Sequence, residues 1–107
     1  MRFPDLVLAN NLAQGLQIYV NTPDAVLIDV RTLEEYSTGH VPGSLNVPLD
    51  GIEDEIYELV PDADTPVFLY CRSGNRSVQA AALLREAGYD NAVSIGGVNG
   101  YKGELKK

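Results

Sequence analysis

One short stretch of the sequence combines a nucleophile, positive charge and flexible residues. It is "LYCRSGNRS", Leu69 to Ser77, and it holds the only cysteine of the chain, Cys71. Arg72 and Arg76 follow closely, although the chain as a whole has a formal net charge of -7. A cysteine reacts as a thiolate, and it is mostly protonated at neutral pH unless its surroundings lower its pKa. Nearby cations and converging backbone N–H groups both have this effect. The stretch is therefore typical of a cysteine nucleophile that meets an anionic substrate.

The residues after Cys71 are small enough for several backbone N–H groups to converge on the sulfur. Gly74 can adopt a left-handed conformation, which tight anion-binding turns often need. A helix that begins near Ser77 would add its unpaired N–H groups and the positive end of its dipole. A buried structural cysteine is the alternative, but it needs neither two arginines nor a glycine in the following turn. We therefore expect Cys71 to be the nucleophile and six residues to bind the substrate: Arg72, Ser73, Gly74, Asn75, Arg76 and Ser77.

Short apolar runs alternate with amphipathic stretches along the chain. The runs predict buried strands at 25–30, 45–47, 66–71 and 92–95, and a fifth, edge strand at 5–8. The amphipathic stretches predict helices at 11–20, 32–39, 49–60 and 77–87. This alternation favours an α/β fold, with a mostly parallel five-stranded sheet and helices on both faces. Ligands of such sheets bind at the carboxyl ends of the strands, and Cys71 lies at such an end.

Two of the predicted helices carry clear boundary signals. Thr32 followed by Glu35 three residues later forms the pattern of a capping box, which starts the helix at 32–39. Gly88 supplies a left-handed stop for the helix at 77–87. These signals predict where the helix at 32–39 begins and where the helix at 77–87 ends.

Composition limits the kind of molecule further. The 107 residues fit one domain, and 45% hydrophobic with 21% charged residues is usual for a soluble globular protein. The acidic balance argues against a nucleic-acid partner, which would need a basic face. One cysteine excludes an internal disulfide and a multi-cysteine metal site, and we expect no metal and no organic cofactor. No run reaches the roughly 18 apolar residues of a membrane span, and the N-terminus lacks the pattern of a secretory signal. We therefore expect a cytoplasmic protein with no membrane partner.

Two long segments of the chain resemble the rhodanese family of single-domain sulfurtransferases. The first is "LIDVRTLEEYSTGHVPGSLNVP" (27–48), with Asp-Val-Arg, Glu-x-Tyr and Gly-His-Val-Pro-Gly-Ser in order. The second is "VFLYCRSGNRSVQAAALLREAGYDNAVSIGGV" (67–98), with the cysteine loop, its helix and a closing Gly-Gly. Both segments in this order are highly specific. The resemblance implies a single rhodanese domain over residues 1–107.

The resemblance also implies a covalent mechanism with two half-reactions. The Cys71 thiolate attacks the outer sulfur of thiosulfate, sulfite leaves, and a Cys71 persulfide remains. Cyanide or a thiol then takes this sulfur. The N–H groups of residues 72–77 and the Ser77 hydroxyl would hold the persulfide, while Arg72 and Arg76 would bind the small anionic donor. Glutathione and a thioredoxin-like protein are the thiol acceptors that we expect.

Two alternatives share this chemistry or this fold. A persulfide carrier would use the same cysteine to deliver sulfur to a protein partner, with thiosulfate only a laboratory donor. Cell-division tyrosine phosphatases and related arsenate reductases have the pattern Cys-x5-Arg, which would place the arginine at position 77. Here that position is Ser77, and Arg76 comes one residue early. The shorter loop suits a single sulfur better than a phosphate or an arsenate.

Three other polar residues invite a catalytic interpretation. Asp29 and Arg31 are two apart on a strand and so share a face. The resemblance gives this pair a structural role, and we interpret it as an ion pair that ties a loop to the strand end. His40, the only histidine, lies in the family in a turn distant from the cysteine, and a preformed thiolate needs no general base. The acids of 49–60 fit the solvated face of a helix better than a cation site.

The chain departs from the family near its end. Where members commonly have Gly-Gly-Ile-x-x-Trp, this chain has Gly-Gly-Val-Asn-Gly-Tyr at 96–101, so Tyr101 takes the tryptophan position. We expect Tyr101 to pack a last helix against the sheet, and Gly100 to weaken that helix.

Overall fold

Four strands and five helical segments make up the part of the chain that is described, residues 11–107 of a computed structural model. The strands are β1 (Val26–Asp29), β2 (Leu45–Asn46), β3 (Val67–Cys71) and β4 (Ala92–Gly97). The helices are α2 (Leu12–Val20), α3 (Leu33–Thr38), α4 (Ile52–Leu59) and α5 (Asn75–Glu86), and a 3-10 turn, η1 (Leu49–Gly51), leads into α4. The edge strand predicted at 5–8 lies outside the described residues.

The sheet is parallel, with the strand order β2-β1-β3-β4. Ile28 of β1 pairs with Leu45 on one side and with Leu69 on the other. Cys71, the last residue of β3, pairs with Gly97, the last residue of β4. All residues of β3 are buried, which explains why its sequence is a continuous apolar run. The predicted α/β fold is confirmed, with four strands where five were predicted.

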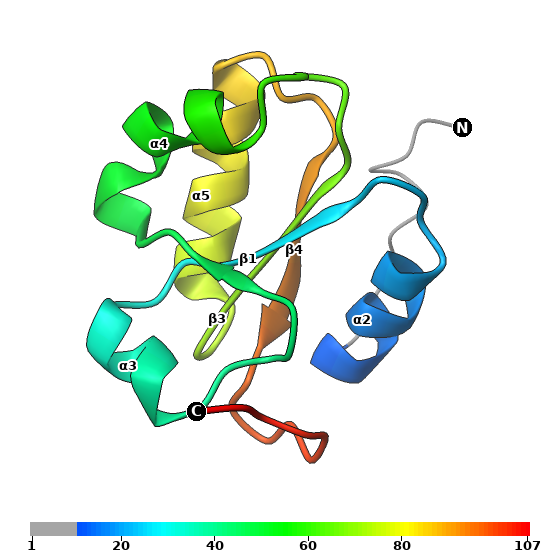
Figure 1. Ribbon diagram of the computed structural model, residues 1–107, viewed down its shortest axis with the longest axis vertical. Coiled ribbons are helices and arrows are strands. Elements are labelled where there is room, and N and C mark those ends of the chain that lie inside the picture. Colours follow the sequence, from blue (N-terminus) through cyan, green and yellow to red (C-terminus); the bar gives the residue numbers. More distant parts are fainter. Residues whose placement is uncertain (1–10) are drawn as a thin grey trace.

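Helices cover both faces of the sheet. Helices α4 and α5 lie on one side and α2 on the other (Figure 1). Because successive side chains of a strand point to opposite faces, β3 contributes Val67, Leu69 and Cys71 to the cluster with α4 and α5. Its other residues, Phe68 and Tyr70, join the cluster on the α2 side. The sulfur of Cys71 therefore emerges on the face that α5 covers.

Helix α2 approaches the sheet closely because it has a glycine where it meets β4. Gly15 is buried, and a Cβ atom there would lie 2.4 Å from the Cβ of Ile95. Leu12, one turn earlier, is buried as well. Val20, the last residue of α2, is 67% exposed. The buried face of α2 is thus set by its first turn, near the carboxyl edge of the sheet.

The last helix predicted after β4 is wrong, because residues 98–107 contain no helix. The backbone of this segment is bonded to the cysteine loop: Val98 donates to the Cys71 carbonyl at 2.9 Å, and Asn99 donates to the Arg72 carbonyl at 2.8 Å. Gly100 then turns the chain with a φ of 83°. Tyr101 still packs as an anchor, half-buried against the α2-side core. The segment after β4 is therefore tied to the cysteine loop.

The end of the chain returns to the turn that precedes β2. His40 and Lys106 form an isolated antiparallel bridge, in which each backbone N–H donates to the other residue's carbonyl at 2.7 Å. This contact holds the C-terminal segment beside the turn that contains His40.

Candidate active site

The nucleophile lies where strand β3 ends and helix α5 begins. Cys71 is fully buried. Helix α5 starts at Asn75, two residues before the predicted start, because Gly74 serves as its N-cap with a left-handed φ of 102°. Only residues 72–74 separate the strand from the helix. Arg76 and Ser77 therefore belong to the first turn of α5, where backbone N–H groups have no partner within the helix.

These free N–H groups are directed at the sulfur. The N–H of Gly74 donates to Cys71 Sγ at 3.0 Å, and the N–H of Ser77 at 3.4 Å. The Ser77 Oγ lies 3.5 Å from the same sulfur. The sequence predicted such a cradle, and the structure brings Gly74 to Cys71 through its backbone and Ser77 through both backbone and side chain.

Burial and hydrogen bonding act in opposite directions on the pKa of Cys71. Burial, the largest single influence, raises the pKa because it disfavours the charged thiolate. The hydrogen bonds from the Ser77 hydroxyl and from the N–H groups of Ser77, Gly74 and Ser73 outweigh it, so the pKa is lowered overall. The arginines are not among the largest influences, in contrast to what the sequence led us to expect. The thiolate is favoured first by the Ser77 hydroxyl and then by the backbone N–H groups of the loop.

A second serine, Ser94, supports the cradle and was not found from the sequence. Its Oγ lies 2.7 Å from the Ser77 Oγ. The Ser77 hydroxyl has a single proton, and it also lies 3.1 Å from the Gly74 carbonyl. When Cys71 is a thiolate, Ser77 can donate to the sulfur while its oxygen accepts from Ser94. The one signal in the sequence is a polar residue inside the apolar run of β4, on the strand beside the cysteine.

Arg76 is engaged by a partner from helix α3. Its Nη1 lies 2.6 Å from Glu35 Oε1, and its Nη2 lies 2.9 Å from Oε2. Glu35 also accepts from the backbone N–H and the hydroxyl of Thr32, so the predicted capping box is confirmed. The hydrogen bond from Arg76 is the main reason why the pKa of Glu35 falls to about 2. The positive charge of Arg76 is therefore largely balanced before any substrate arrives.

Arg72 is the arginine of the loop that remains free. Its side chain is exposed and has no hydrogen bond or ion pair among residues 11–107. Its backbone is held tightly, since a Cβ atom on Gly97 would lie 2.2 Å from the Arg72 carbonyl oxygen and 2.7 Å from the Ser73 nitrogen. Ser73 and Asn75 are exposed, like Arg72. Any role of these three side chains in donor binding stays a prediction.

The buried pair of Asp29 and Arg31 has the structural role that we predicted. Arg31 Nη2 lies 2.7 Å from Asp29 Oδ2, and its Nε lies 3.0 Å from both carboxylate oxygens. The same Nη2 donates to the Gly39 carbonyl at 2.7 Å. The pair thus ties the end of β1 to the turn after α3. His40 lies in that turn, with its ring stacked on Tyr36 at 3.7 Å and its Nδ1 3.0 Å from the Tyr36 carbonyl oxygen.

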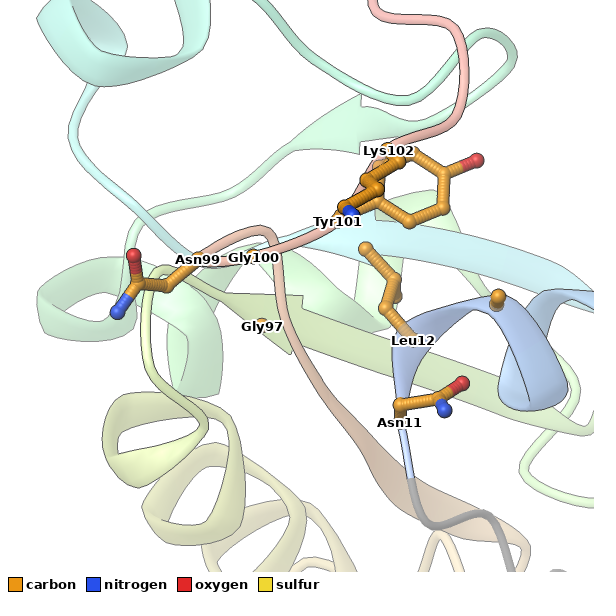
Figure 2. A pocket seen from close by; sticks show the side chains of 8 residues that line it. Asn11, Leu12, Gly97, Asn99, Gly100, Tyr101 and Lys102 are labelled. Atoms are coloured by element: carbon orange, nitrogen blue, oxygen red, sulfur yellow. The ribbon is translucent and has the colours of Figure 1, made fainter.

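Cavities lie on both sides of the cysteine loop. Toward β1, a cavity of about 80 Å³ lies among Val30, Thr32, Leu49, Asp50 and Arg76. Toward β4, a cavity of about 250 Å³ is lined by Arg72, Ser73 and Gly96, among others. A neighbouring cavity of about 260 Å³ extends along residues 99–102 (Figure 2).

Two structural observations bear on metals and membranes. No group of three or more His, Cys, Asp or Glu residues is placed to hold a metal ion within the described range. None of the helices there has the length and apolar character needed to cross a membrane.

Comparison with known proteins places this site in a family. The family model "Rhodanese-like domain" matches residues 12–104. Thiosulfate sulfurtransferase PspE of Escherichia coli (strain K12) is 41% identical over 71 residues, which are 66% of this chain and 68% of that protein. A sulfurtransferase of Allochromatium vinosum is 38% identical over 89 residues, 83% of this chain and 78% of that protein.

Solved structures agree with this placement. A structure described as "rhodanese with anions from E. coli" has a TM-score of 0.72 and 36% identity, covering 78% of this chain and 98% of that chain. The human single-domain sulfurtransferase TSTD1 has a TM-score of 0.70 and 29% identity, covering 83% and 88% of the two chains. The chain, whose cysteine loop connects strand β3 to helix α5, belongs to the rhodanese-like domain family.

Proposed function

We propose that this chain is a sulfurtransferase that moves the sulfane sulfur of thiosulfate, or of another persulfide donor, to a thiol or cyanide through a Cys71 persulfide. The observation that carries the proposal is the position of the Gly74 and Ser77 N–H groups, 3.0 and 3.4 Å from Cys71 Sγ. They favour the thiolate that attacks the donor, and they would likewise favour the negative charge of a persulfide.

Both half-reactions balance without a cofactor. In the first, the Cys71 thiolate forms a bond to the outer sulfur of thiosulfate, and the bond between the two thiosulfate sulfurs breaks. Its electron pair leaves with sulfite, and Cys71 carries a persulfide anion. In the second, an acceptor thiolate or cyanide attacks the outer sulfur of the persulfide. The electron pair of the broken bond returns to Cys71, which becomes a thiolate again.

The dimensions of the loop favour sulfur chemistry over phosphate chemistry. Three residues connect β3 to α5, and the N–H groups of Gly74 and Ser77 already converge on the sulfur. The arginine of the loop that would clamp a tetrahedral oxyanion, Arg76, is instead paired with Glu35. We therefore expect no turnover of aryl phosphates.

A persulfide carrier is the second candidate. A relative named "Putative sulfur carrier protein YrkF", from Bacillus subtilis (strain 168), is 32% identical over 69 residues, which are 36% of that protein. A carrier would form the same Cys71 persulfide and pass it to a protein partner. The two candidates differ in turnover with small molecules, because a carrier has no need to release product repeatedly.

Steady-state kinetics with thiosulfate and cyanide test the proposal. A sulfurtransferase gives saturable turnover, with parallel double-reciprocal lines when both substrates are varied, because a covalent intermediate separates the half-reactions. Cys71→Ser abolishes this turnover. Stoichiometric loading without turnover would favour the carrier, and aryl phosphate hydrolysis that depends on Cys71 would contradict both.

A further inference from the structure

The segment that follows β4 is bonded to the cysteine loop through two consecutive backbone N–H groups. Val98 donates to the Cys71 carbonyl oxygen at 2.9 Å, and Asn99 donates to the Arg72 carbonyl oxygen at 2.8 Å. Gly97, the residue before them, packs so closely against the loop that a Cβ atom there would collide with the Arg72 carbonyl. The orientation of the first peptide groups of the loop is therefore fixed from the end of β4.

The peptide group between Arg72 and Ser73 connects this contact to the sulfur. It is trans, since residues 11–107 contain no cis peptide bond, and the C=O and N–H of a trans peptide point in opposite directions. Because the Arg72 carbonyl points to Asn99, the Ser73 N–H points away from Asn99. This N–H is among those that hydrogen-bond the Cys71 sulfur, and the next one, that of Gly74, donates to it at 3.0 Å. A rotation of this peptide would therefore turn donors away from the sulfur.

A type II turn presents the Asn99 N–H to the loop. The Tyr101 N–H donates to the Val98 carbonyl at 2.9 Å, and Gly100 has a φ of 83° whereas Asn99 has no positive φ. The turn itself does not use the N–H of its second residue, so that of Asn99 can donate outward. The Asn99 side chain is exposed, and Figure 2 shows it pointing away from the Tyr101 ring. Asn99 thus acts on the loop through its backbone.

We propose that the backbone N–H of Asn99 is a positioning group of the active site, which holds the peptide between Arg72 and Ser73 so that the donors of the loop face the Cys71 thiolate; this rests on the proposed function, in which Cys71 is the nucleophile. The Asn99 N–H touches neither the sulfur nor a substrate. Its hydrogen bond to the Arg72 oxygen also polarises the Ser73 N–H of the same peptide group, which makes that N–H a better donor.

The test replaces this N–H by an oxygen atom and leaves every side chain in place. Cys71 is the only cysteine of the chain, so a synthetic segment 71–107 can be ligated there to recombinant residues 1–70. The full chain then carries an ester at Asn99, and the same ligated chain with all its amides is the reference. Thiolate absorbance against pH, with Cys71→Ser as the blank, gives the midpoint of ionisation. The ester moves this midpoint upward by about 0.5 to 1 on the pH scale, the size of one lost hydrogen bond.

Two control chains keep the hydrogen bond from residue 99. An ester at Lys102, whose N–H has no hydrogen bond within residues 11–107, leaves the midpoint unchanged, and so does Asn99→Ala. Asn99→Pro is a second, recombinant variant, because proline suits the second position of a type II turn. Its ring carbon takes the space of the hydrogen bond, so the midpoint rises at least as far as with the ester. Arg76, a charged side chain that interacts with Cys71, is the same in all these chains.

Urea unfolding of the same chains separates positioning of the donors from simple support of the fold. A lower free energy of unfolding for the Asn99 ester with an unchanged midpoint would overturn the proposal. An equal shift for the Lys102 ester or for Asn99→Ala would also overturn it. The titration needs no sulfur donor. A failure of the unmodified chain to take up sulfur from thiosulfate would therefore overturn the sulfurtransferase function, while the midpoints would still decide the role of Asn99.

Discussion

At the scale of single residues, the reactivity of Cys71 depends on where hydrogen-bond donors point. Burial alone would keep the thiol protonated, and the donors of the loop overcome it. Such donors would let a fully buried sulfur act as a nucleophile without a histidine beside it. The single histidine stacks on Tyr36 instead.

The role of Ser94 is testable because its hydroxyl reaches Cys71 only through Ser77. Ser94→Ala removes the donor to the Ser77 oxygen, so Ser77 holds the thiolate less well and the pKa of Cys71 rises. The rate of thiosulfate loading against pH therefore shifts to higher pH, and the rate at neutral pH falls about threefold, consistent with a lost hydrogen bond. Ser77→Ala shifts the profile in the same direction and further.

A matched control is Ser37→Ala, a serine on α3 that is exposed. Its rate of thiosulfate loading depends on pH in the same way as that of the unmodified chain. An unchanged profile for Ser94→Ala, or a lower rate with no shift along the pH axis, would mean that Ser94 only fills space.

We predict that Arg72, rather than Arg76, recognises a charged donor, because Arg72 has no ion pair within residues 11–107 whereas Arg76 is paired with Glu35. Arg72→Gln raises the KM for thiosulfate about three- to fivefold at low salt, the size expected for an exposed charge, and leaves an uncharged sulfur donor unaffected. Replacing Glu35 and Arg76 together by glutamine changes this KM less, because their charges already cancel. Loading kinetics with both donors measure the difference, with Arg85→Gln near the far end of α5 as control. Equal effects of Arg72→Gln on both donors would exclude charge recognition.

At the scale of elements, the strands and helices can be predicted from local sequence patterns more readily than the contacts that build the site. The continuous apolar runs at 25–30 and 66–71 predicted β1 and β3 to within a residue. The start of α5 was predicted two residues late, because Asn75 and Arg76 add nothing to its apolar face. That start is set by Gly74 and by the hydrogen bonds to Cys71.

The contacts that complete the site join distant parts of the sequence. Glu35 and Arg76 are 41 residues apart, and Ser77 and Ser94 are 17 apart. No local propensity encodes such pairs, because they exist only once the strand order is known. The predicted C-terminal helix is absent from residues 98–107, where Gly100 has a left-handed φ of 83° that a right-handed helix does not contain.

The ion pair between α3 and α5 gives a pH-dependent contribution to stability. Since the pKa of Glu35 falls from its ordinary 4.5 to about 2, the contribution is present above about pH 5 and is lost as the pH falls toward 2. Glu35→Gln keeps the acceptor of the capping box but removes the charge. Urea unfolding shows it about 0.5 kcal/mol less stable at neutral pH, as for a partly exposed pair, and the gap closes by pH 2.

Glu34→Gln is the control for this comparison, because Glu34 is exposed on the same turn and has no ion pair in residues 11–107. A gap between the Glu35 variant and the unmodified chain that stays constant with pH would show that the charge is not its source.

The closing glycine of β4 is required by the cysteine loop. A Cβ atom at Gly97 would collide with the Arg72 carbonyl oxygen, a backbone atom that cannot move away cheaply. Gly97→Ala therefore lowers the free energy of unfolding by about 1–3 kcal/mol and slows thiosulfate loading, because the loop is displaced. Gly51→Ala is the control, since its Cβ would meet only the end of the flexible Glu55 side chain, at 3.2 Å. Equal free energies of unfolding of the two variants in urea would show that the loop can move to accommodate the Cβ atom at little cost in stability.

At the scale of the whole molecule, the fold concentrates function at one edge of the sheet. The chain has a formal net charge of -7, yet no acidic side chain among residues 11–107 lines the cavities beside Arg72. The parallel strand order brings the ends of β3 and β4 together there, with the first turn of α2 alongside. We expect an acidic protein to admit an anionic donor most readily at this edge.

The central claim, that Cys71 carries sulfur, is tested most directly by intact mass. The protein is incubated with thiosulfate, freed of excess reagent and weighed, and then treated with cyanide and weighed again. The account predicts a gain equal to one sulfur atom, its loss on cyanide treatment, and no gain in Cys71→Ser. No gain in the unmodified chain, or the same gain in Cys71→Ser, would contradict it.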